Sequence, residues 1–145
     1  MRIAWAYFDT SVLLKRYVRE AGSARAMALF RRHRLLSSAL APVEAASALR
    51  LRQLTGDLAE REVAAALARM AIERARWELI GPTSIVLIRA EELVRAYALR
   101  TLDAVHLASA VIFQAETGRQ LRFLTAEARQ RAAALRLHLE VVWVG

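Results

Sequence analysis

Short apolar runs alternate along the chain with longer stretches in which apolar residues recur at helical spacing. Each run is only a few residues long and mostly apolar at consecutive positions, which is typical of a strand buried on both faces of a parallel sheet. The strands that this pattern predicts cover residues 3–8, 35–38, 77–80, 122–125 and 140–144.

Helices are predicted between these runs, and glycines mark several of their ends. Gly22, Gly56 and Gly118 each end a predicted helix, and Pro42 suits a first helical turn. The segment 104–115 is apolar nearly all round, so we expect a helix buried in the core. The predicted helices are one with Leu14, Tyr17 and Val18, then 23–32, 42–55, one with Val63, Leu67 and Met70, one with Val86, Ala90, Leu93 and Tyr97, then 104–115 and 127–135.

This alternation of strands and helices indicates an α/β fold. A chain of 145 residues is the size of one domain, and no repeat, linker or low-complexity segment divides it. The apolar fraction of 57% is too high for a disordered chain. We therefore predict that residues 1–145 form a single domain.

Composition excludes several classes of protein. Cysteine is absent, which excludes disulfide scaffolds, thiolate zinc sites and cysteine nucleophiles. The longest run without a charged residue, 104–115, is shorter than the roughly 18 residues of a membrane span. Only a short uncharged run separates Arg2 from Asp9, unlike a signal peptide. We expect a soluble cytoplasmic domain with no membrane partner.

The chain is strongly basic, with a net charge of +8 and a pI near 11.3. Lys15 is the sole lysine among 22 basic residues, so the excess is almost entirely arginine. A genome biased toward arginine and alanine codons explains this composition. A polyanion partner such as a nucleic acid explains it equally well, because arginine pairs bidentately with phosphate.

Four acidic residues fall where predicted strands end or predicted helices begin. Asp9 follows the first strand, Asp103 opens the buried helix, Glu44 lies in a first helical turn, and Glu127 follows the strand that ends at Thr125. The carboxyl edge of a parallel sheet brings such positions together. Converging carboxylates repel one another unless cations lie between them, and oxygen ligands favour Mg²⁺ or Mn²⁺.

Each of these positions also has a purely structural explanation. Asp103 suits a helix cap, and Glu44 and Glu127 suit the first helical turn, where the helix dipole favours an acid. Asp57 follows Gly56 and is predicted to cap the next helix. His106 lies one helical turn after Asp103, and we expect a buried or hydrogen-bonded structural imidazole rather than a metal ligand.

Four segments, taken together, resemble the PIN-domain ribonucleases, specifically the VapC-type toxins. They occur in the order that the family has, and the resemblance as a whole covers residues 7–142. The third is the most specific, and the combination at these spacings carries more weight than any one segment. The segments are 8–17 (FDTSVLLKRY) with Glu20 and Gly22, 42–44 (PVE) with Ala48 and Leu49, 100–110 (RTLDAVHLASA), and 123–127 (FLTAE).

The resemblance implies a Mg²⁺-dependent endoribonuclease with a three-layer α/β/α fold and a small central parallel sheet. Such toxins usually form homodimers and are held inactive by a cognate VapB-type antitoxin. Carried over by position, Asp9 and Asp103 match the principal metal ligands of the family, Glu44 its third acid and Glu127 its fourth. The RNA would be hydrolysed by a metal-activated water.

The chain departs from the family pattern at two positions. The fourth acid is usually aspartate, so Glu127 places its carboxylate one methylene farther out and is expected to act through water. A glycine before the last strand is replaced by His138, and histidine tolerates a positive φ better than most residues. The hydroxyls of Thr10 and Ser11 are expected either to bind a carboxylate or phosphate or to cap the following helix.

Other functions compete with this one. A haloacid-dehalogenase-type phosphatase needs a second aspartate two residues after Asp9, where Ser11 stands, and a receiver domain needs a lysine late in the chain, whereas Lys15 is the only lysine. A catalytically silent RNA-binding or antitoxin-binding module on the same fold stays open. Metal-dependent RNA cleavage that an Asp9→Asn variant lacks distinguishes the nuclease from that module.

Overall fold

The computed structural model describes residues 3–145 and contains one five-stranded sheet in which every strand pair is parallel. The strand order is β3-β2-β1-β4-β5, with Tyr7 of β1 opposite Leu36 of β2 on one side and Phe123 of β4 on the other. The predicted strands are confirmed. Their bounds are β1 Trp5–Phe8, β2 Arg34–Ser38, β3 Glu78–Ile80, β4 Arg122–Thr125 and β5 Glu140–Trp143.

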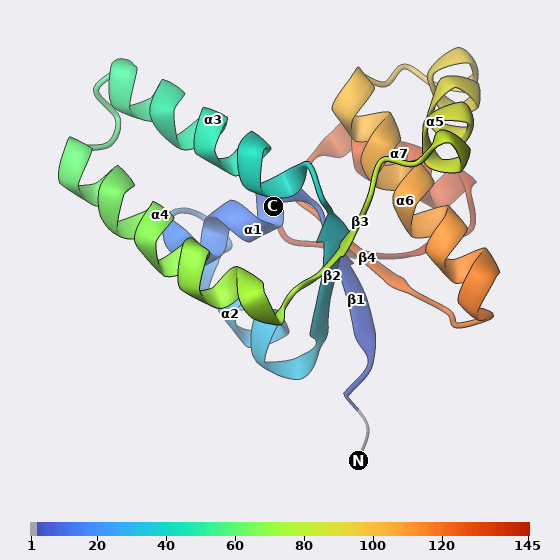
Figure 1. The fold of residues 1–145 in the computed structure, drawn as a ribbon, viewed down its shortest axis with the longest axis horizontal. Coiled ribbons are helices and arrows are strands. Elements are labelled where there is room, and N and C mark those ends of the chain that lie inside the picture. Colours follow the sequence, from blue (N-terminus) through green and yellow to red (C-terminus); the bar gives the residue numbers. More distant parts are fainter. Residues whose placement is uncertain (1–2) are drawn as a thin grey trace.

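Helices cover both faces of this sheet, which confirms the predicted α/β/α layers. Figure 1 shows α1 to α4 on one side of the strands and α5 to α7 on the other. The bounds are α1 Thr10–Tyr17, α2 Ser23–Arg32, α3 Ala41–Leu54, α4 Glu60–Glu73, a short 3₁₀ turn Arg74–Arg76, α5 Ser84–Ala96, α6 Thr101–Thr117 and α7 Ala128–Arg136.

Side chains on β1 alternate between two hydrophobic cores, because successive residues of a strand point to opposite faces. Tyr7 packs with residues of α5, α6 and α7, and its ring stacks on that of Phe123 at 5.2 Å between centroids. Ala6 and Phe8 pack on the opposite face with residues of α1 and α2. A third cluster joins α1 to α3 and α4. Strand β1 therefore lies in the middle of the sheet and contributes side chains to the hydrophobic cores on both faces.

Helix α6 is the predicted core helix, and it extends past the predicted 104–115 at both ends. Every residue from Asp103 to Ala110 is buried, as expected for a helix that is apolar nearly all round. It ends at Gly118, whose φ is +67°. Within residues 3–145 no single helix is long and apolar enough to cross a membrane, although α5 and α6, bent by 120°, pass that test of length and composition when joined.

The chain order reverses around β1, since β2 pairs on one side of it and β4 on the other. Such a switch point leaves a crevice beyond the carboxyl ends of the two strands, and α/β proteins place their binding sites there. Asp9 directly follows β1, and Thr125 ends β4. The fold therefore places the first candidate acid at the edge where a site is expected.

Candidate metal-binding and active site

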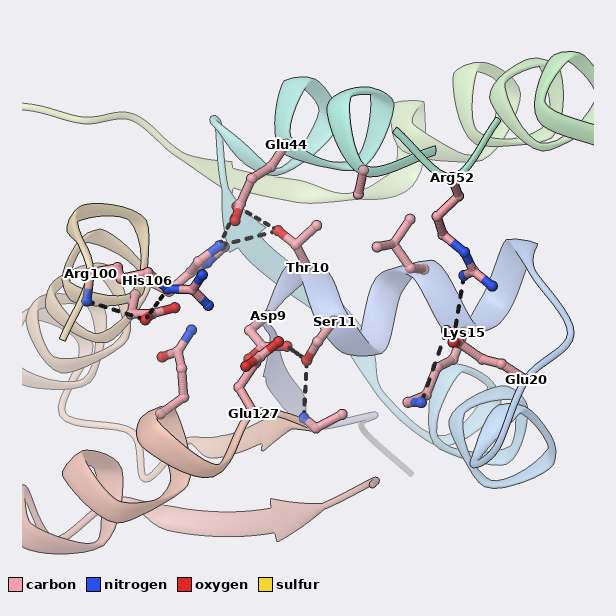
Figure 2. Close-up of a pocket in the computed structure, with 15 residues that line it drawn as sticks. Asp9, Thr10, Ser11, Lys15, Glu20, Glu44, Arg52, Arg100, His106 and Glu127 are labelled. Atoms are coloured by element: carbon pink, nitrogen blue, oxygen red, sulfur yellow. Dashed lines mark hydrogen bonds and ion pairs between the residues drawn. The ribbon is translucent and has the colours of Figure 1, made fainter. Parts of the chain in front are cut away.

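The candidate site is a cavity of about 350 Å³ at this edge of the sheet. It is rich in acids although the protein as a whole is basic, and Figure 2 shows the side chains that line it. The four predicted acids share this one cavity while coming from four separate segments. Five of the fourteen acidic residues of the chain line it: Asp9, Glu20, Glu44, Asp103 and Glu127.

Asp9 is buried, with 1% of its surface exposed, and both of its carboxylate oxygens accept hydrogen bonds. Oδ1 accepts from the Ser11 hydroxyl and, at 3.2 Å, from the backbone N–H of Val12, so Asp9 also caps α1. Oδ2 accepts from the hydroxyl of Thr125 at the end of β4. The carboxylate is thus held across the switch point by groups from both sides.

Burial raises the pKa of Asp9, because a carboxylate in a poorly solvated place loses stability when it ionises. A positive charge on His106 when its ring is protonated, and the hydrogen bonds from Ser11 and Thr125, oppose this effect without cancelling it. A cation in the cavity would stabilise the ionised form of Asp9. Acids with a shifted pKa in a cavity are typical of functional sites.

Glu44 lies in the first turn of α3 and points toward α1 and α6. Its Oε1 accepts a hydrogen bond from the Thr10 hydroxyl at 2.6 Å and lies 2.7 Å from Nε2 of His106. Burial alone would raise the pKa of Glu44, but the hydrogen bonds from His106 and Thr10, the positive charge of Arg100 and that of a protonated His106 hold it below its usual value. Glu44 is therefore ionised at neutral pH.

Asp103 lies in the first turn of α6, where it both caps the helix and lines the cavity. Its Oδ2 accepts a hydrogen bond from the backbone N–H of Arg100 at 3.3 Å, which caps the helix. The same oxygen lies 3.7 Å from Nε of Arg100, whose side chain is 70% exposed. Arg100 is thus a solvent-exposed cation beside the candidate ligand, available to an anionic partner.

Glu127 stands immediately before α7 and lines the cavity, but its side chain does not cap that helix. Its backbone N–H donates to the Thr125 hydroxyl oxygen at 3.0 Å. The same hydroxyl donates to Asp9, so the turn between β4 and α7 is tied to the first candidate acid. A capping role does not explain Glu127.

A second group of charges lies at the other end of the cavity. Nζ of Lys15 donates to the carbonyl of Ala21 at 2.6 Å and lies 3.9 Å from Glu20, which also lies 3.5 Å from Arg52. Arg52 in turn binds Asp57 at 2.6 Å. Ala59 is the residue that precedes α4, so the prediction that Asp57 caps this helix is wrong. The negative charge of Glu20 is balanced by these cations, whereas Asp9 and Glu127 have no arginine or lysine partner within 4 Å among residues 3–145.

The donor set of the cavity fits a hard divalent cation, since it consists of carboxylate oxygens on a polar wall. No three histidine, aspartate or glutamate side chains of residues 3–145 lie close enough to hold one ion between them. The expected convergence of carboxylates is therefore only partial. Each acid is held by its own donors, so a cation here would rely on one or two carboxylates and several waters, as Mg²⁺ usually does.

Two cavity features were not predicted from the sequence. Thr125 was predicted only as a strand end, yet its hydroxyl orients Asp9. Gln130 of α7 is 2% exposed and lines the cavity, and its Oε1 has no hydrogen-bond partner. A glutamine three residues after Glu127 carried no sequence signal. By contrast, the hydroxyls of Thr10 and Ser11 were expected either to bind a carboxylate or phosphate or to cap a helix, and both bind carboxylates. The predicted burial of His106 is confirmed.

The fold has counterparts among solved structures. A toxin–antitoxin complex from Klebsiella pneumoniae aligns with a TM-score of 0.64 and 16% identity, covering 97% of this chain and 98% of that chain. The crystal structure of FitAcB from Neisseria gonorrhoeae aligns with a TM-score of 0.63 and 15% identity, covering 94% and 95%. At these identities the likeness shows the fold.

The sequence comparisons identify the family. Two proteins of Mycobacterium tuberculosis, ribonuclease VapC45 of strain CDC 1551 and ribonuclease VapC49 of strain H37Rv, are each 41% identical to this chain over 106 residues. The match covers 72% of this chain and 74% of each relative. The PIN domain family matches residues 6–135. The resemblance carried by the four sequence segments is confirmed, and the chain belongs to the PIN-domain family of VapC-type ribonucleases.

Proposed function

We propose that this chain is a metal-dependent endoribonuclease and the toxin of a toxin–antitoxin pair, and that residues 1–145 act as one PIN-like nuclease domain. The observation that carries this proposal is that Asp9, Glu44, Asp103 and Glu127, from four separate segments, line a single cavity. The relatives at 41% identity are called ribonucleases, which supports the same activity.

Of Asp9, Asp103 and Glu44, one or two would bind a divalent cation, Mg²⁺ or Mn²⁺, directly, and the others would act through the waters that complete its coordination. When bound, such a cation supplies Lewis-acid chemistry that lowers the pKa of the attacking water and neutralises charge on the leaving 3′ oxygen. The chain's own hydroxyls direct the acids: Ser11 and Thr125 orient Asp9. Glu127, at the start of α7, acts on the site through water.

The positive charge of the protein would bind the phosphate backbone of the RNA near this cavity. The net charge of +8 favours a polyanion, and Arg100 stands exposed beside Asp103. A guanidinium in this place can bind a phosphate oxygen of the RNA while the acids hold the cation. Binding of RNA is therefore expected to weaken steeply as salt rises.

The proposed partners are a VapB-type antitoxin and a second copy of this chain. One of the structural neighbours is itself a toxin–antitoxin complex. Helix α5 exposes four large apolar side chains, Ile85, Leu87, Ile88 and Val94, which supports a homodimer through this helix. Because its substrate is RNA, we place the protein in the cytoplasm.

Cleavage of RNA by the purified protein tests the proposal. We expect cleavage with Mg²⁺, none in chelator, and a rate lowered by orders of magnitude in Asp9→Asn and Asp103→Asn. Glu127→Gln is expected to cost less than either. Glu116→Gln, an exposed position on the same helix as Asp103 and outside the cavity, is the matched control and keeps the parent rate.

The catalytically silent module gives a different result. A parent protein that binds RNA but does not cleave it with either Mg²⁺ or Mn²⁺ would overturn the nuclease assignment. An undiminished rate in Asp103→Asn would show that Asp103 is not a ligand.

A further inference from the structure

His106 is a buried ionisable group that the proposed mechanism leaves unused. It lies on α6 one turn after Asp103 and is only 2% exposed. Its two ring nitrogens have partners on different elements. Nδ1 lies 2.7 Å from the Tyr7 hydroxyl of β1, and Nε2 lies 2.7 Å from Oε1 of Glu44 on α3. Figure 2 shows the Glu44, Thr10 and His106 side chains pointing toward one another.

The hydrogen bonds determine which nitrogen carries the proton. An ionised carboxylate only accepts, so Nε2–H of His106 donates to Glu44. Nδ1 of a neutral ring is then an acceptor, and the Tyr7 hydroxyl donates to it. Burial raises the pKa of Tyr7 well above its usual value, so that this hydroxyl keeps its proton. Every donor in the chain from Tyr7 to Glu44 therefore has an acceptor.

Thr10 completes this arrangement on the cavity side. Its hydroxyl donates to the same Oε1 of Glu44 at 2.6 Å and lies 3.1 Å from Nε2 of His106. The Glu44 carboxylate is therefore fixed through one oxygen by groups from α1 and α6. Only that oxygen is occupied by these partners, and Glu44 still lines the cavity.

We propose that His106 is a positioning residue, held by Tyr7, that orients the Glu44 carboxylate toward the cation site. The proposal deepens the proposed function and rests on it, since it assumes that Glu44 helps to hold a divalent cation. An imidazole with only a structural role would satisfy its ring nitrogens within the core. Here one nitrogen instead binds an acid that lines the cavity, and that acid belongs to a helix on the other side of the sheet.

The test measures Mn²⁺ affinity without RNA, by the loss of the free Mn²⁺ signal in electron paramagnetic resonance. His106→Leu removes the donor to Glu44 and should weaken Mn²⁺ binding by about 10- to 100-fold, the usual cost of losing a partner of a metal ligand. His106→Gln keeps an N–H donor and should restore most of the affinity. Tyr7→Phe removes the hydroxyl that fixes the ring while keeping the stacked aromatic core, and should weaken binding in the same direction.

The decisive comparison repeats these variants in a Glu44→Gln background. If His106 acts through Glu44, His106→Leu and Tyr7→Phe should have no further effect on Mn²⁺ affinity there. Circular dichroism checks that each variant is folded, and Tyr7→Phe gives the same comparison if His106→Leu does not fold.

Three results would overturn the inference. They are a folded His106→Leu or Tyr7→Phe with the parent's affinity, an effect of the same size in the Glu44→Gln background, or a parent that binds no Mn²⁺. A parent that binds Mn²⁺ but cleaves no RNA would contradict the proposed function alone and leave the role of His106 standing.

Discussion

At the scale of single residues, the cavity acids are held by hydroxyl, amide and imidazole donors rather than by one another. Asp9 accepts from Ser11 and Thr125, and Glu44 from Thr10 and His106. Neutral donors such as hydroxyls orient a carboxylate without cancelling its charge. The acids therefore keep the negative charge that a cation needs, and in the absence of the cation that charge is costly in a buried place.

The raised pKa of Asp9 predicts a pH dependence of stability in chelator. Between the ordinary pKa of aspartate and the raised one, the folded state binds more protons than the unfolded state, so the free energy of unfolding falls as pH rises. The side chain of Asp9→Asn does not titrate, so the variant lacks this pH dependence, but asparagine still caps helices well. Glu44, whose lowered pKa acts in the opposite direction, is present in both proteins and cancels in the difference.

We therefore expect the stability of Asp9→Asn relative to the parent to increase as pH rises from the acid range to neutrality. Urea unfolding of both proteins in chelator, at a series of pH values, measures this difference. A difference that stays constant or shrinks with pH would show that burial does not raise the pKa of Asp9.

The cavity acids could be predicted from the sequence, whereas most of their partners could not. Strand ends and helix starts meet at one edge of a parallel sheet, so the pattern alone placed Asp9 and Asp103 together. Thr125 lies 116 residues from Asp9, and nothing local distinguishes it from any threonine that ends a strand. The roles of the acids in catalysis stay predictions, although their shared cavity is confirmed.

At the scale of elements, the start of α2 depends on a backbone conformation that favours glycine. Gly22 precedes this helix with a φ of +84°. A Cβ at this position would lie 2.4 Å from the carbonyl oxygen of Val144, just past β5. The close approach joins the beginning of the chain's second helix to the end of its last strand.

Gly22→Ala is therefore expected to destabilise the fold by about 2 kcal/mol or more. A left-handed conformation costs a residue with a Cβ up to about 2 kcal/mol, and the clash with the Val144 carbonyl oxygen adds to that cost. Gly81→Ala is the matched control, because its φ is not in the left-handed range and a Cβ there meets no atom within 4 Å. The control should change stability by less than about 1 kcal/mol. Urea unfolding of the two variants checks this, and equal losses would contradict it.

The elements themselves follow closely from the apolar pattern, and the errors lie at their ends. Residues 3–8 were predicted as a strand, but pairing begins at Trp5. Asp57 was predicted to cap a helix, yet Ala59 is the residue that precedes α4, and the Asp57 carboxylate binds Arg52. His138 has the positive φ of 60° that its place before the last strand predicted. Tertiary pairing, which local patterns do not contain, decides such ends.

At the scale of the whole molecule, charge and apolar surface are unevenly distributed. The acids of the cavity lie in a chain with 22 basic and 14 acidic residues, which supports the proposed cation in the cavity and the proposed RNA substrate outside it. Helix α5, on the opposite side of the sheet from α3 and α4, exposes four large apolar side chains. These two features separate the proposed catalytic and self-association surfaces.

The proposed homodimer gives a prediction that depends on α5. Ile88 is 57% exposed on this helix, and Ile88→Asp would place a charge in the dimer interface, which is expected to yield a monomer. Ile72→Asp on α4, where Ile72 is 78% exposed, is the control and should remain dimeric. Light scattering after size-exclusion chromatography measures both masses. A monomeric parent, or a dimeric Ile88→Asp, would contradict the proposed interface.

The central claim is that Asp9 and its neighbours form one divalent-cation site, and melting curves with and without Mg²⁺ test it most directly. In chelator, Asp9→Asn should melt at the same temperature as the parent or higher, because neutralising one acid relieves repulsion. Mg²⁺ should reverse this order, since a ligand at a hundredfold excess over its Kd stabilises the folded parent by about 2.7 kcal/mol. The variant should respond only weakly. A less stable variant in chelator, together with no Mg²⁺ shift in either protein, would show that Asp9 is only a structural cap.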